Sequence, residues 1–561
     1  MIPITIRGNG ELAASCCTCV QIAAPSDVQV LAAPSLPAQQ AKKAPAETQG
    51  SYGQILKSSA LIGGSSVLNI AMGIVRTKAM ALLLGPSGFG LFGLYGSIQN
   101  LTQSIAGMGI NSSGVRQIAE AAGSGDEARI AQTAAVLRRT SVALGLLGAV
   151  LLVAFSRQIA QLTFGSTERA SALSLLSIAV FFSLVSAGQG ALIQGMRRIA
   201  DLARMNVLGA LFGVCSAIPL VYFYRERGVV PSLVSVAAMT ILTSWWYSRK
   251  IEVQEITVTL AQVWQEASAL LKLGSAFMAS GFLTMGVAYF VRIVILRKVG
   301  FEATGLYQSA WTLGGLYVGI ILGAMGADFY PRLTASIQNH EECNRLVNEQ
   351  TLIGLLLAGP GVLASLTFAP LVIALLYSTK FGAAVGVLRW ICLGAALQVI
   401  TWPMGFILVA KGRQGLFFLS ELAWTIVAVA LAWFCVKRYG LNGGGIAFFG
   451  SYVFHLALTY PVVHWLTGFR WSAANRHTGA VFLSLIAVVF CGIQMLPSAV
   501  SLAIGMLAVV GSCVYSVRAL LRLVPSDRLP RPIQRLLAAS RLLGPELLGS
   551  PATADPGGLV Q

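Results

Sequence analysis

Six ionisable side chains lie inside long apolar runs of the sequence, and four of the six are cations. The cations are Arg76, Lys78, Arg292 and Arg389, and the acids are Asp328 and Glu421. On insertion scales a cation at the centre of a bilayer costs roughly 2.5–3.5 kcal/mol, so it is expected to face protein or water rather than lipid. A guanidinium group in such a place can hold a phosphate through two parallel hydrogen bonds. The four cations are therefore predicted to bind the anionic group of a substrate.

Other interpretations of these residues stay open at the level of the sequence. Arg76 and Arg292 lie past the midpoints of their apolar runs, so both could extend to the outer interface instead. Asp328 and Glu421 are candidates for proton coupling or for structural pairing with a cation. Five aromatic residues could stack on sugar rings, although such residues more often pack in the core or mark an interface. They are Tyr289, Tyr307, Trp311, Tyr317 and Trp402.

The composition is typical of a membrane protein. Of 561 residues, 56% are hydrophobic and 11% are charged, and the mean hydropathy is +0.74. Soluble domains carry roughly 25% charged residues. The net charge of +18 would suggest a nucleic-acid partner, but Lys and Arg fall mostly in short loops and in the tails, where they set orientation. We therefore expect no nucleic-acid partner.

Apolar runs separated by short polar loops predict an all-α, polytopic membrane protein with about 14 transmembrane helices. The spans are predicted near 58–84, 88–113, 131–155, 171–195, 203–224, 229–247, 268–296, 304–329, 350–370, 383–409, 415–436, 443–466, 478–496 and 498–520. Gly85-Pro86, between the first two, predicts a break in the helix. Loops on one side carry more Arg and Lys than loops on the other, although several outer loops carry cations as well. With an even number of spans, this asymmetry predicts that both termini are cytoplasmic.

The stretch from Ile55 to Gly96 has a second copy 215 positions downstream (272 − 57 = 215). The matching residues are Lys57, Ser65, Leu68, Gly85, Gly90 and Leu91 in the first copy, and Lys272, Ser280, Leu283, Gly300, Gly305 and Leu306 in the second. Arg76 and Arg292 are nearly equivalent in the two copies (292 − 76 = 216). Because six spans per copy is an even number, both copies enter the bilayer in the same sense. The duplication therefore predicts two pseudo-symmetric six-helix lobes with a cavity between them.

We expect the chain to have five parts. The two lobes are predicted over residues 55–250 and 265–466, followed by an accessory pair of helices over 477–521. The Ala- and Pro-rich residues 1–54 are expected to form a disordered extension, and residues 522–561 a basic cytoplasmic tail.

Sequence motifs for catalysis, cofactors and metals are absent. No G-x-x-x-x-G-K-[ST] phosphate loop occurs, and the four His residues form neither HExxH nor an evident triad. Cys16, Cys17 and Cys19 lack the second half of a metal site. No loop is long enough for a folded catalytic domain. Transport is therefore favoured over catalysis, and we expect no cofactor and no metal.

The residues around the first cation resemble a known family. Arg76, followed by LLLGPSGFGLFGLYGSIQNL and GMGINSSGVRQIAE, resembles the start of polysaccharide and O-antigen flippases, which belong to the multidrug/oligosaccharidyl-lipid/polysaccharide exporter superfamily. The resemblance continues through VRIVILRKVGFEATGLYQSAW and GAMGADFYPRL, and covers roughly Ile55 to Leu520. It implies alternating access between two six-helix lobes in a bacterial inner membrane. The long segment before Ile55 departs from the family pattern.

The same resemblance implies a lipid-linked oligosaccharide substrate, carried on undecaprenyl diphosphate and moved from the inner to the outer leaflet. The oligosaccharide would be a repeat unit of O-antigen, capsule or exopolysaccharide. In the related lipid II flippases, Arg residues early in each lobe are thought to meet the diphosphate, and Arg76 and Arg292 are similarly placed. Membrane lipids would surround the chain, and a polysaccharide polymerase and chain-length proteins are candidate partners.

Four alternative functions remain at this point. A cation-coupled multidrug antiporter of the same superfamily would carry buried acids in its first lobe, and the predicted span interiors there hold none. A lipid II-type flippase would share the placement of the cations. A membrane glycosyltransferase would need a long loop or paired acids outside the bilayer. A structural scaffold would leave the intramembrane cations without a role.

Overall fold

The computed structural model describes residues 48–251 and 260–523. Within these ranges, the side chains of residues 48–63, of most residues from 260 to 280 and of a few residues between 324 and 331 lie outside the description. The predicted extension 1–54 and the tail 522–561 therefore fall mostly outside the described residues, as do Cys16, Cys17 and Cys19.

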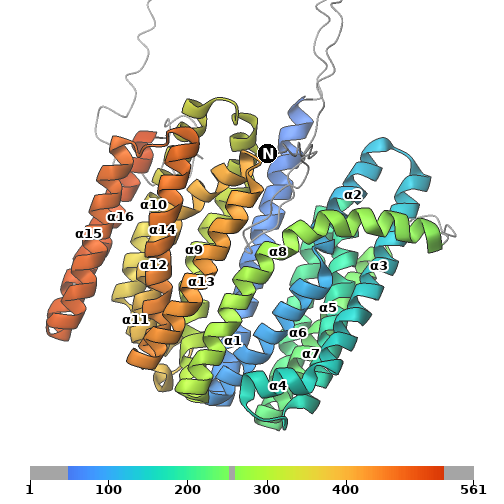
Figure 1. The fold of residues 1–561 in the computed structure, drawn as a ribbon, viewed down its shortest axis with the longest axis horizontal. Helices are drawn as coiled ribbons and strands as arrows, with labels where there is room; N and C mark the ends of the chain where they lie inside the picture. Colours follow the sequence, from blue (N-terminus) through green and yellow to red (C-terminus); the bar gives the residue numbers. More distant parts are fainter. Residues whose placement is uncertain (1–47, 252–259, 524–561) are drawn as a thin grey trace, which may run out of the picture.

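All regular secondary structure in the described ranges is helical, which confirms the predicted all-α fold class (Figure 1). The first half of the chain forms α1 (Thr48–Gly107), α2 (Ile110–Ser124), α3 (Glu127–Ala154), α4 (Ser156–Phe164), α5 (Ala170–Gly195), α6 (Ile199–Tyr224), η1 (Arg225–Gly228) and α7 (Val229–Ser248). The second half forms α8 (Leu260–Lys298), α9 (Phe301–Ala335), α10 (His340–Thr367), α11 (Ala369–Leu376), η2 (Thr379–Phe381), α12 (Ala384–Ala410), α13 (Gln414–Tyr439), α14 (Asn442–Thr467), α15 (Ala473–Met495) and α16 (Ser498–Leu523).

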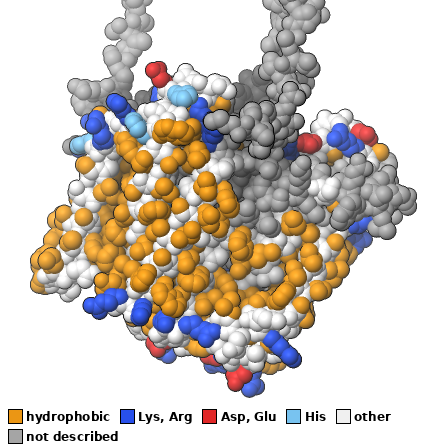
Figure 2. All heavy atoms as spheres, viewed as in Figure 1, with side chains coloured by type: hydrophobic (Ala, Val, Ile, Leu, Met, Phe, Trp, Pro, Cys, Tyr) orange, Lys and Arg blue, Asp and Glu red, His pale blue; other side chains and the backbone are white. Residues whose placement is uncertain are grey.

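Most of these helices are long and apolar enough to cross a membrane. Ten described segments meet both criteria, and two of them, Gly64–Gly107 and Ile199–Ser248, contain a reversal of the chain. Helices α8 and α9, with 39 and 35 residues, are also long enough to span a bilayer. Figure 2 shows the matching surface, an apolar band between two ends that carry Lys and Arg. The chain is a multi-pass membrane protein, and these helices are compatible with the predicted number of about 14 spans.

The predicted break at Gly85-Pro86 is confirmed as a sharp turn inside α1. Gly85 has φ 66° and ψ −177°, a conformation that glycine adopts readily and other residues avoid. The equivalent residue of the second copy, Gly300, has φ 113° and ψ −179° and separates α8 from α9. Both turns lie at the end of the molecule away from Thr48 and Leu523 (Figure 1). Each copy therefore begins with a helical hairpin that opens toward the same end.

The backbone repeats with the same spacing as the sequence. Beyond the two hairpin turns, positive φ angles occur at Arg197 (55°) and Gly412 (66°), and again at Arg225 (52°) and Gly440 (57°). Both pairs are separated by 215 residues (412 − 197 = 215 and 440 − 225 = 215). Helices α3 and α10, which are equivalent in the duplication, both contain 28 residues. This recurrence confirms the predicted pseudo-symmetric duplication.

The helices pack mainly in two groups. One group contains α1, α3, α5, α6 and α7, and the other contains α8, α9, α10, α12, α13 and α14 (Figure 1). Helices α15 and α16 pack against α10, at the edge of the second group. The limits of the two lobes stay predictions, and α1 begins at Thr48, before the predicted boundary at residue 55.

The prediction that the second span continues to residue 113 is wrong. Helix α1 ends at Gly107, because Met108 (φ 44°) and Gly109 (φ 67°) both adopt left-handed backbone conformations before α2 begins. The apolar run hides this turn, since it continues through Ile110. The short helices α2, α4 and α11 were also not predicted.

Candidate functional site

Arg292 lies in the interior of the second group of helices and is only 5% exposed. Its Nε donates a hydrogen bond to Oε1 of Gln308 at 2.7 Å, and its Nη1 donates to the carbonyl oxygen of Ala288 at 2.6 Å. The guanidinium carbon lies 5.9 Å from the ring centre of Tyr307 and 5.6 Å from that of Trp311, within the range of cation–π contacts. The side chain therefore does not extend to the outer interface, and protein groups surround its charge.

Gln308, which the sequence did not identify, connects Arg292 to α1. Its Nε2 donates to Oγ1 of Thr312 at 3.1 Å. A Cβ atom at Gly93 of α1 would lie 2.7 Å from both Cγ and Oε1 of Gln308, so the amide packs directly on the backbone of Gly93. Arg292 therefore lies immediately behind a contact between the two halves of the chain.

Arg76 and Lys78 lie in a half of α1 that packs loosely. None of the described side chains from Gly64 to Ala79 is buried, and Val67 and Val75 are 66% and 52% exposed. Both cations are partly buried, and neither has a hydrogen bond or ion pair within the described part of the chain. Helix α1, which carries both cations, contacts helices of both groups (Figure 1).

Arg76 and Arg292 do not occupy equivalent positions in the duplication. At the spacing of 215, the equivalent of Arg292 is Thr77 (292 − 77 = 215). One residue is a rotation of about 100° around an α-helix, so the two arginines face different directions within their own lobes. Arg292 is enclosed in protein and Arg76 is half-buried, and no contact joins the two among the described residues.

Arg389 lies apart from these residues, near the start of α12 at the end that holds the hairpin turns. It is partly buried, and its Nε is buried with no hydrogen-bond partner in the described part of the chain. No described contact joins Arg389 to Arg292 or to Arg76. Among the described residues, no hydrogen bond or ring contact shared by the four predicted cations links them into one site.

Of the two predicted acids, Glu421 has a partner that the sequence did not indicate. Its Oε1 lies 3.8 Å from Nε2 of His455, and each side chain is 14% exposed. His455 lies at the middle of α14, and Glu421 lies two turns into α13. Asp328 belongs to α9, and its side chain lies outside the described residues.

Two equivalent glycines meet where the two halves of the chain touch. A Cβ atom on Gly90 would lie 2.5 Å from the carbonyl oxygen of Phe301 and 2.8 Å from the backbone nitrogen of Gly305. A Cβ atom on Gly305 would overlap the carbonyl oxygen of Pro86. These pairs are related by the duplication (305 − 90 = 215 and 301 − 86 = 215). The second half of α1 therefore crosses the start of α9 backbone to backbone, on a pseudo-two-fold axis.

Charged and aromatic side chains close the same end of the molecule. Arg297, at the end of α8, donates from Nη2 to two carbonyl oxygens in the last turn of α4. Arg169 lies 5.3 Å and 5.1 Å from the ring centres of Phe164 in α4 and Phe301 in α9, which stack 6.3 Å apart. These contacts join the two groups of helices. They also give a structural role to Arg169 and Arg297. Both are cations on the predicted outer side, where cations reduce the charge asymmetry that predicts the topology.

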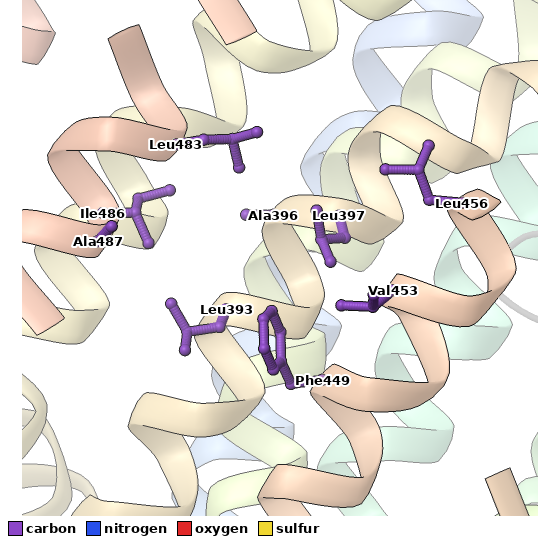
Figure 3. A pocket seen from close by; sticks show the side chains of 9 residues that line it. All are labelled: Leu393, Ala396, Leu397, Phe449, Val453, Leu456, Leu483, Ile486 and Ala487. Atoms are coloured by element: carbon purple, nitrogen blue, oxygen red, sulfur yellow. The ribbon is translucent and has the colours of Figure 1, made fainter. Parts of the chain in front are cut away.

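A separate apolar pocket of about 300 Å³ lies among α12, α14 and α15 (Figure 3). Its lining consists of Leu393, Ala396, Leu397, Phe449, Val453, Leu456, Leu483, Ile486 and Ala487. No charged side chain lines it, so it is not part of an anion-binding site.

Comparison with known proteins agrees with the family resemblance of the sequence. The chain is 22% identical over 414 residues to the lipid III flippase of Escherichia coli K12, an alignment that covers 72% of this chain and 97% of that protein. It is 24% identical over 395 residues to a putative O-antigen transporter of Shigella flexneri, covering 68% and 90% of the two chains. The curated relatives are thus named as a flippase and a transporter.

Solved structures show the same fold. The lipid II flippase MurJ in an inward closed conformation matches with a TM-score of 0.61 at 15% identity, over 83% of this chain and all of that one. An inward-facing multidrug resistance MATE family transporter matches with a TM-score of 0.58 at 19% identity, over 72% and 96% of the two chains. The sequence model for the family described as polysaccharide biosynthesis protein matches residues 79–386. With its fold, its duplicated hairpins and this match, the chain belongs to the polysaccharide biosynthesis protein family.

Proposed function

We propose that the protein is a flippase that moves a lipid-linked oligosaccharide across a bacterial inner membrane. The observation that carries this proposal is the similarity, over about 70% of the chain, to relatives named lipid III flippase and O-antigen transporter. The substrate would be an oligosaccharide on undecaprenyl diphosphate, a repeat unit of O-antigen, capsule or exopolysaccharide. Two observations support alternating access for an anionic head group. The two helix groups touch at one end, and Arg76, which has no described protein partner, lies on α1, a helix that contacts both groups.

The two arginines act in sequence in this mechanism. Arg76 and Lys78 meet the diphosphate first, because their donors are not engaged by described protein groups. Arg292 lies behind the packing of Gln308 on Gly93, so it becomes available when that contact opens. The lipid tail stays in the bilayer while the head group crosses between the lobes. Arg389 is a further candidate for an anionic contact near the other end of the path.

We place the end with Thr48 and Leu523 in the cytoplasm, as the charge asymmetry of the loops predicts. The contacts around Gly90 and Gly305 then close the outer side of the path. A head group would therefore enter from the cytoplasmic side in this conformation. A polysaccharide polymerase and chain-length proteins are the candidate partners on the outer side.

The alternative functions fit these observations less well. A multidrug antiporter takes cations, and the acids on the described helices of the first group, Glu127 of α3 and Asp201 of α6, both lie in first turns. Asp201 is paired with Arg198. A lipid II-type flippase shares the fold and the anionic head group, so it is distinguished by its glycan. Transport is proposed rather than catalysis, because the relatives are named for transport.

The proposal is tested in the host organism by deleting the gene and measuring the surface polysaccharide. The deletion should abolish the glycan and leave lipid-linked oligosaccharide in the inner leaflet, and the wild-type gene should restore transport. Arg76→Ala and Arg292→Ala should both fail to restore the glycan while the protein remains in the membrane, because each removes a guanidinium from the path.

The matched control is Arg204→Ala, which removes an arginine whose side chain is 67% exposed on α6. This variant should restore the glycan fully. A deletion strain that keeps its surface polysaccharide would refute the proposed function. Normal glycan from both Arg76→Ala and Arg292→Ala would refute the site and leave the function standing.

A further inference from the structure

Glu421 and His455 lie side by side within the second group of helices. The distance between Oε1 and Nε2 is 3.8 Å, and each side chain is 14% exposed. His455 is 13 residues from the start and 12 from the end of α14, which places it about 18–20 Å from either helix end. An acid and an imidazole at such depth are energetically costly in a membrane. Ionisable residues are therefore rare there and commonly indicate a functional site.

Aromatic rings flank the imidazole of His455. The ring centres of Trp424 and Tyr452 lie 6.1 Å and 6.0 Å from that of His455, on α13 and α14 respectively. These rings contact the imidazole, and only 14% of each side chain of the pair is exposed. The low local dielectric strengthens the interaction between the carboxyl and the imidazole, so their protonation is strongly coupled.

Several buried polar atoms near the pair lack hydrogen bonds. Within the described residues, Nδ1 of His455, Nε1 of Trp424 and the hydroxyls of Thr425 and Thr459 have no partner. The two threonines follow Glu421 and His455 by four residues, so each shares a helix face with one member of the pair. Buried polar atoms are normally satisfied. A group of unsatisfied ones around an acid and a base indicates a site whose hydrogen bonding differs between protonation states.

We propose that Glu421 and His455 together form a proton-binding site that couples proton movement to transport, an inference that rests on the proposed flippase function. With one proton the pair is neutral, as a carboxylic acid beside a neutral imidazole. Release of that proton leaves a carboxylate beside neutral imidazole, with one negative charge. The donors Trp424 Nε1–H and the threonine hydroxyls then stabilise the carboxylate.

The proton site is connected to the substrate site through helix packing. Helix α13, which carries Glu421, packs against α8, which carries Arg292. A movement of α8 when the contact at Gly93 opens would therefore change the surroundings of the pair. Binding of an anion at Arg292 and loss of the proton from the pair would in this way affect the same helix packing.

The helices that pack around the pair carry further charged and titratable groups. On the described parts of α8, α12, α13, α14 and their ends these groups are Arg292, Arg297, Lys298, Arg389, Lys411, Arg413, Lys437, Arg438 and His464, with the titratable Tyr289, Cys392, Cys435, Tyr439, Tyr452 and Tyr460. Arg292 is bonded to Gln308, Arg297 to α4, and Lys411 to the carbonyl oxygen of Ile337.

A proton fits the pair better than a metal ion does. No group of three or more His, Cys, Asp or Glu side chains that could hold a metal occurs among the described residues. Hard cations such as sodium or magnesium prefer several oxygen ligands, and the pair offers one carboxylate and one imidazole.

The test measures protonation directly on the full-length protein, purified in detergent without sodium. Infrared difference spectra between about pH 5 and about pH 8, the range in which imidazole titrates, should show protonation of a carboxyl group. Glu421→Gln should remove this signal, and His455→Gln should move it to a different pH. The controls Glu302→Gln and His340→Gln, at exposed helix starts, should leave it unchanged.

The proposal is overturned if the wild type shows no such signal, or if both pair variants keep it unchanged. A signal that moves when sodium chloride replaces choline chloride would assign the site to a metal ion instead. The glycan assay separates this inference from the proposed function. Deletion of the gene should abolish the glycan, and neither Glu421→Gln nor His455→Gln should restore it. If the deletion abolishes the glycan and both variants restore it, proton coupling at this pair is refuted and the flippase function stands.

Discussion

The guanidinium group of Arg292 donates to a side-chain amide and lies within 6 Å of two aromatic ring centres. A hydrogen bond from a charged group contributes about 1.5–3 kcal/mol, and a desolvated cation–π contact contributes about 2 kcal/mol. Together these terms offset much of the cost of burying the charge. Arg76 has no such partner among the described residues. Two arginines at nearly equivalent positions thus have different energetic roles.

This difference gives a prediction at the scale of the residue. Arg292→Gln should lower the thermal unfolding midpoint of the full-length protein in detergent, with a loss of about 1–3 kcal/mol, because it leaves Gln308 without its buried donor. Arg76→Gln should leave the midpoint nearly unchanged. Inorganic diphosphate should raise the midpoint of the wild type by binding the folded state, and should fail to do so for Arg76→Gln.

Equal effects of the two substitutions on the midpoint would contradict this division of roles. A rise with diphosphate that persists in Arg76→Gln would show that the anion binds elsewhere. Arg204→Ala serves again as the control, since its exposed side chain should affect neither measurement.

At the scale of the element, α3 and α10 begin in the same way. Asp126 and Asn339 each accept hydrogen bonds from two backbone N–H groups in the first turn, which satisfies donors that a helix start leaves free. Helix α10 also anchors the last two helices. The amide of Asn348 donates to the carbonyl oxygen of Arg470 at 3.1 Å and accepts from the backbone nitrogen of Ser472 at 2.8 Å. Asn475 donates to Oδ1 of Asn348 at 2.8 Å, which fixes the start of α15.

The Asn348 network predicts a local loss of order when its central residue is removed. Asn348→Ala should remove the acceptor of the Ser472 backbone N–H and one of the two acceptors of the Asn475 amide, which keeps its bond to the backbone carbonyl oxygen of residue 348. An unsatisfied buried donor costs about 1–3 kcal/mol. Limited proteolysis should therefore cut the segment between α14 and α15 faster than in the wild type. Glu349→Ala is the control, because it removes only an exposed ion pair with Arg345. Equal cleavage rates in the two variants would refute the anchoring role.

At the scale of the whole molecule, a residue on the pseudo-two-fold axis contacts its own equivalent. Gly90 meets Gly305, and Gly93 meets Gln308 at the same spacing (308 − 93 = 215). Glycine is required where the backbones touch, because a Cβ atom on Gly305 would overlap the carbonyl oxygen of Pro86. The stacked rings of Phe164 and Phe301 lie beside this crossing. Opening of this end has to break these contacts together.

Substitution of Gly305 is expected to prevent closure of this end. Gly305→Val places atoms where the backbone of α1 lies, so the two helix groups should separate there. The measurement is the yield of a cross-link between Cys introduced at Phe164 and at Phe301, whose ring centres are 6.3 Å apart, in a protein without other Cys. The yield should fall in Gly305→Val. Gly315→Val, on the same helix where a Cβ atom meets nothing within 4 Å, should cross-link like the parent. A parent-like yield in Gly305→Val would show that the crossing tolerates a side chain.

The sequence by itself determined the helices, the hairpin turn and the duplication. Long apolar runs must bury their backbone polar groups as helices in lipid, so the class of fold follows from composition and spacing. The break at Gly85-Pro86 is predictable because it depends on local backbone properties of these two residue types. Glycine adopts a positive φ readily, and proline lacks the backbone N–H that would continue a helix. The turn at Met108 and Gly109 was missed because its flanks are apolar on both sides.

Only the tertiary structure decided which side chains meet. The direction in which Arg292 points depends on how α8 packs against α9, and a shift of one residue against the repeat is enough to separate it from Arg76. Glu421 and His455 are 34 residues apart (455 − 421 = 34) and lie on different helices, so no spacing rule links them. Their approach, like that of Gly90 and Gly305, results from the packing of one helix on another. The sequence pattern predicts which residues share a face of a helix, but it does not predict which helix packs against that face.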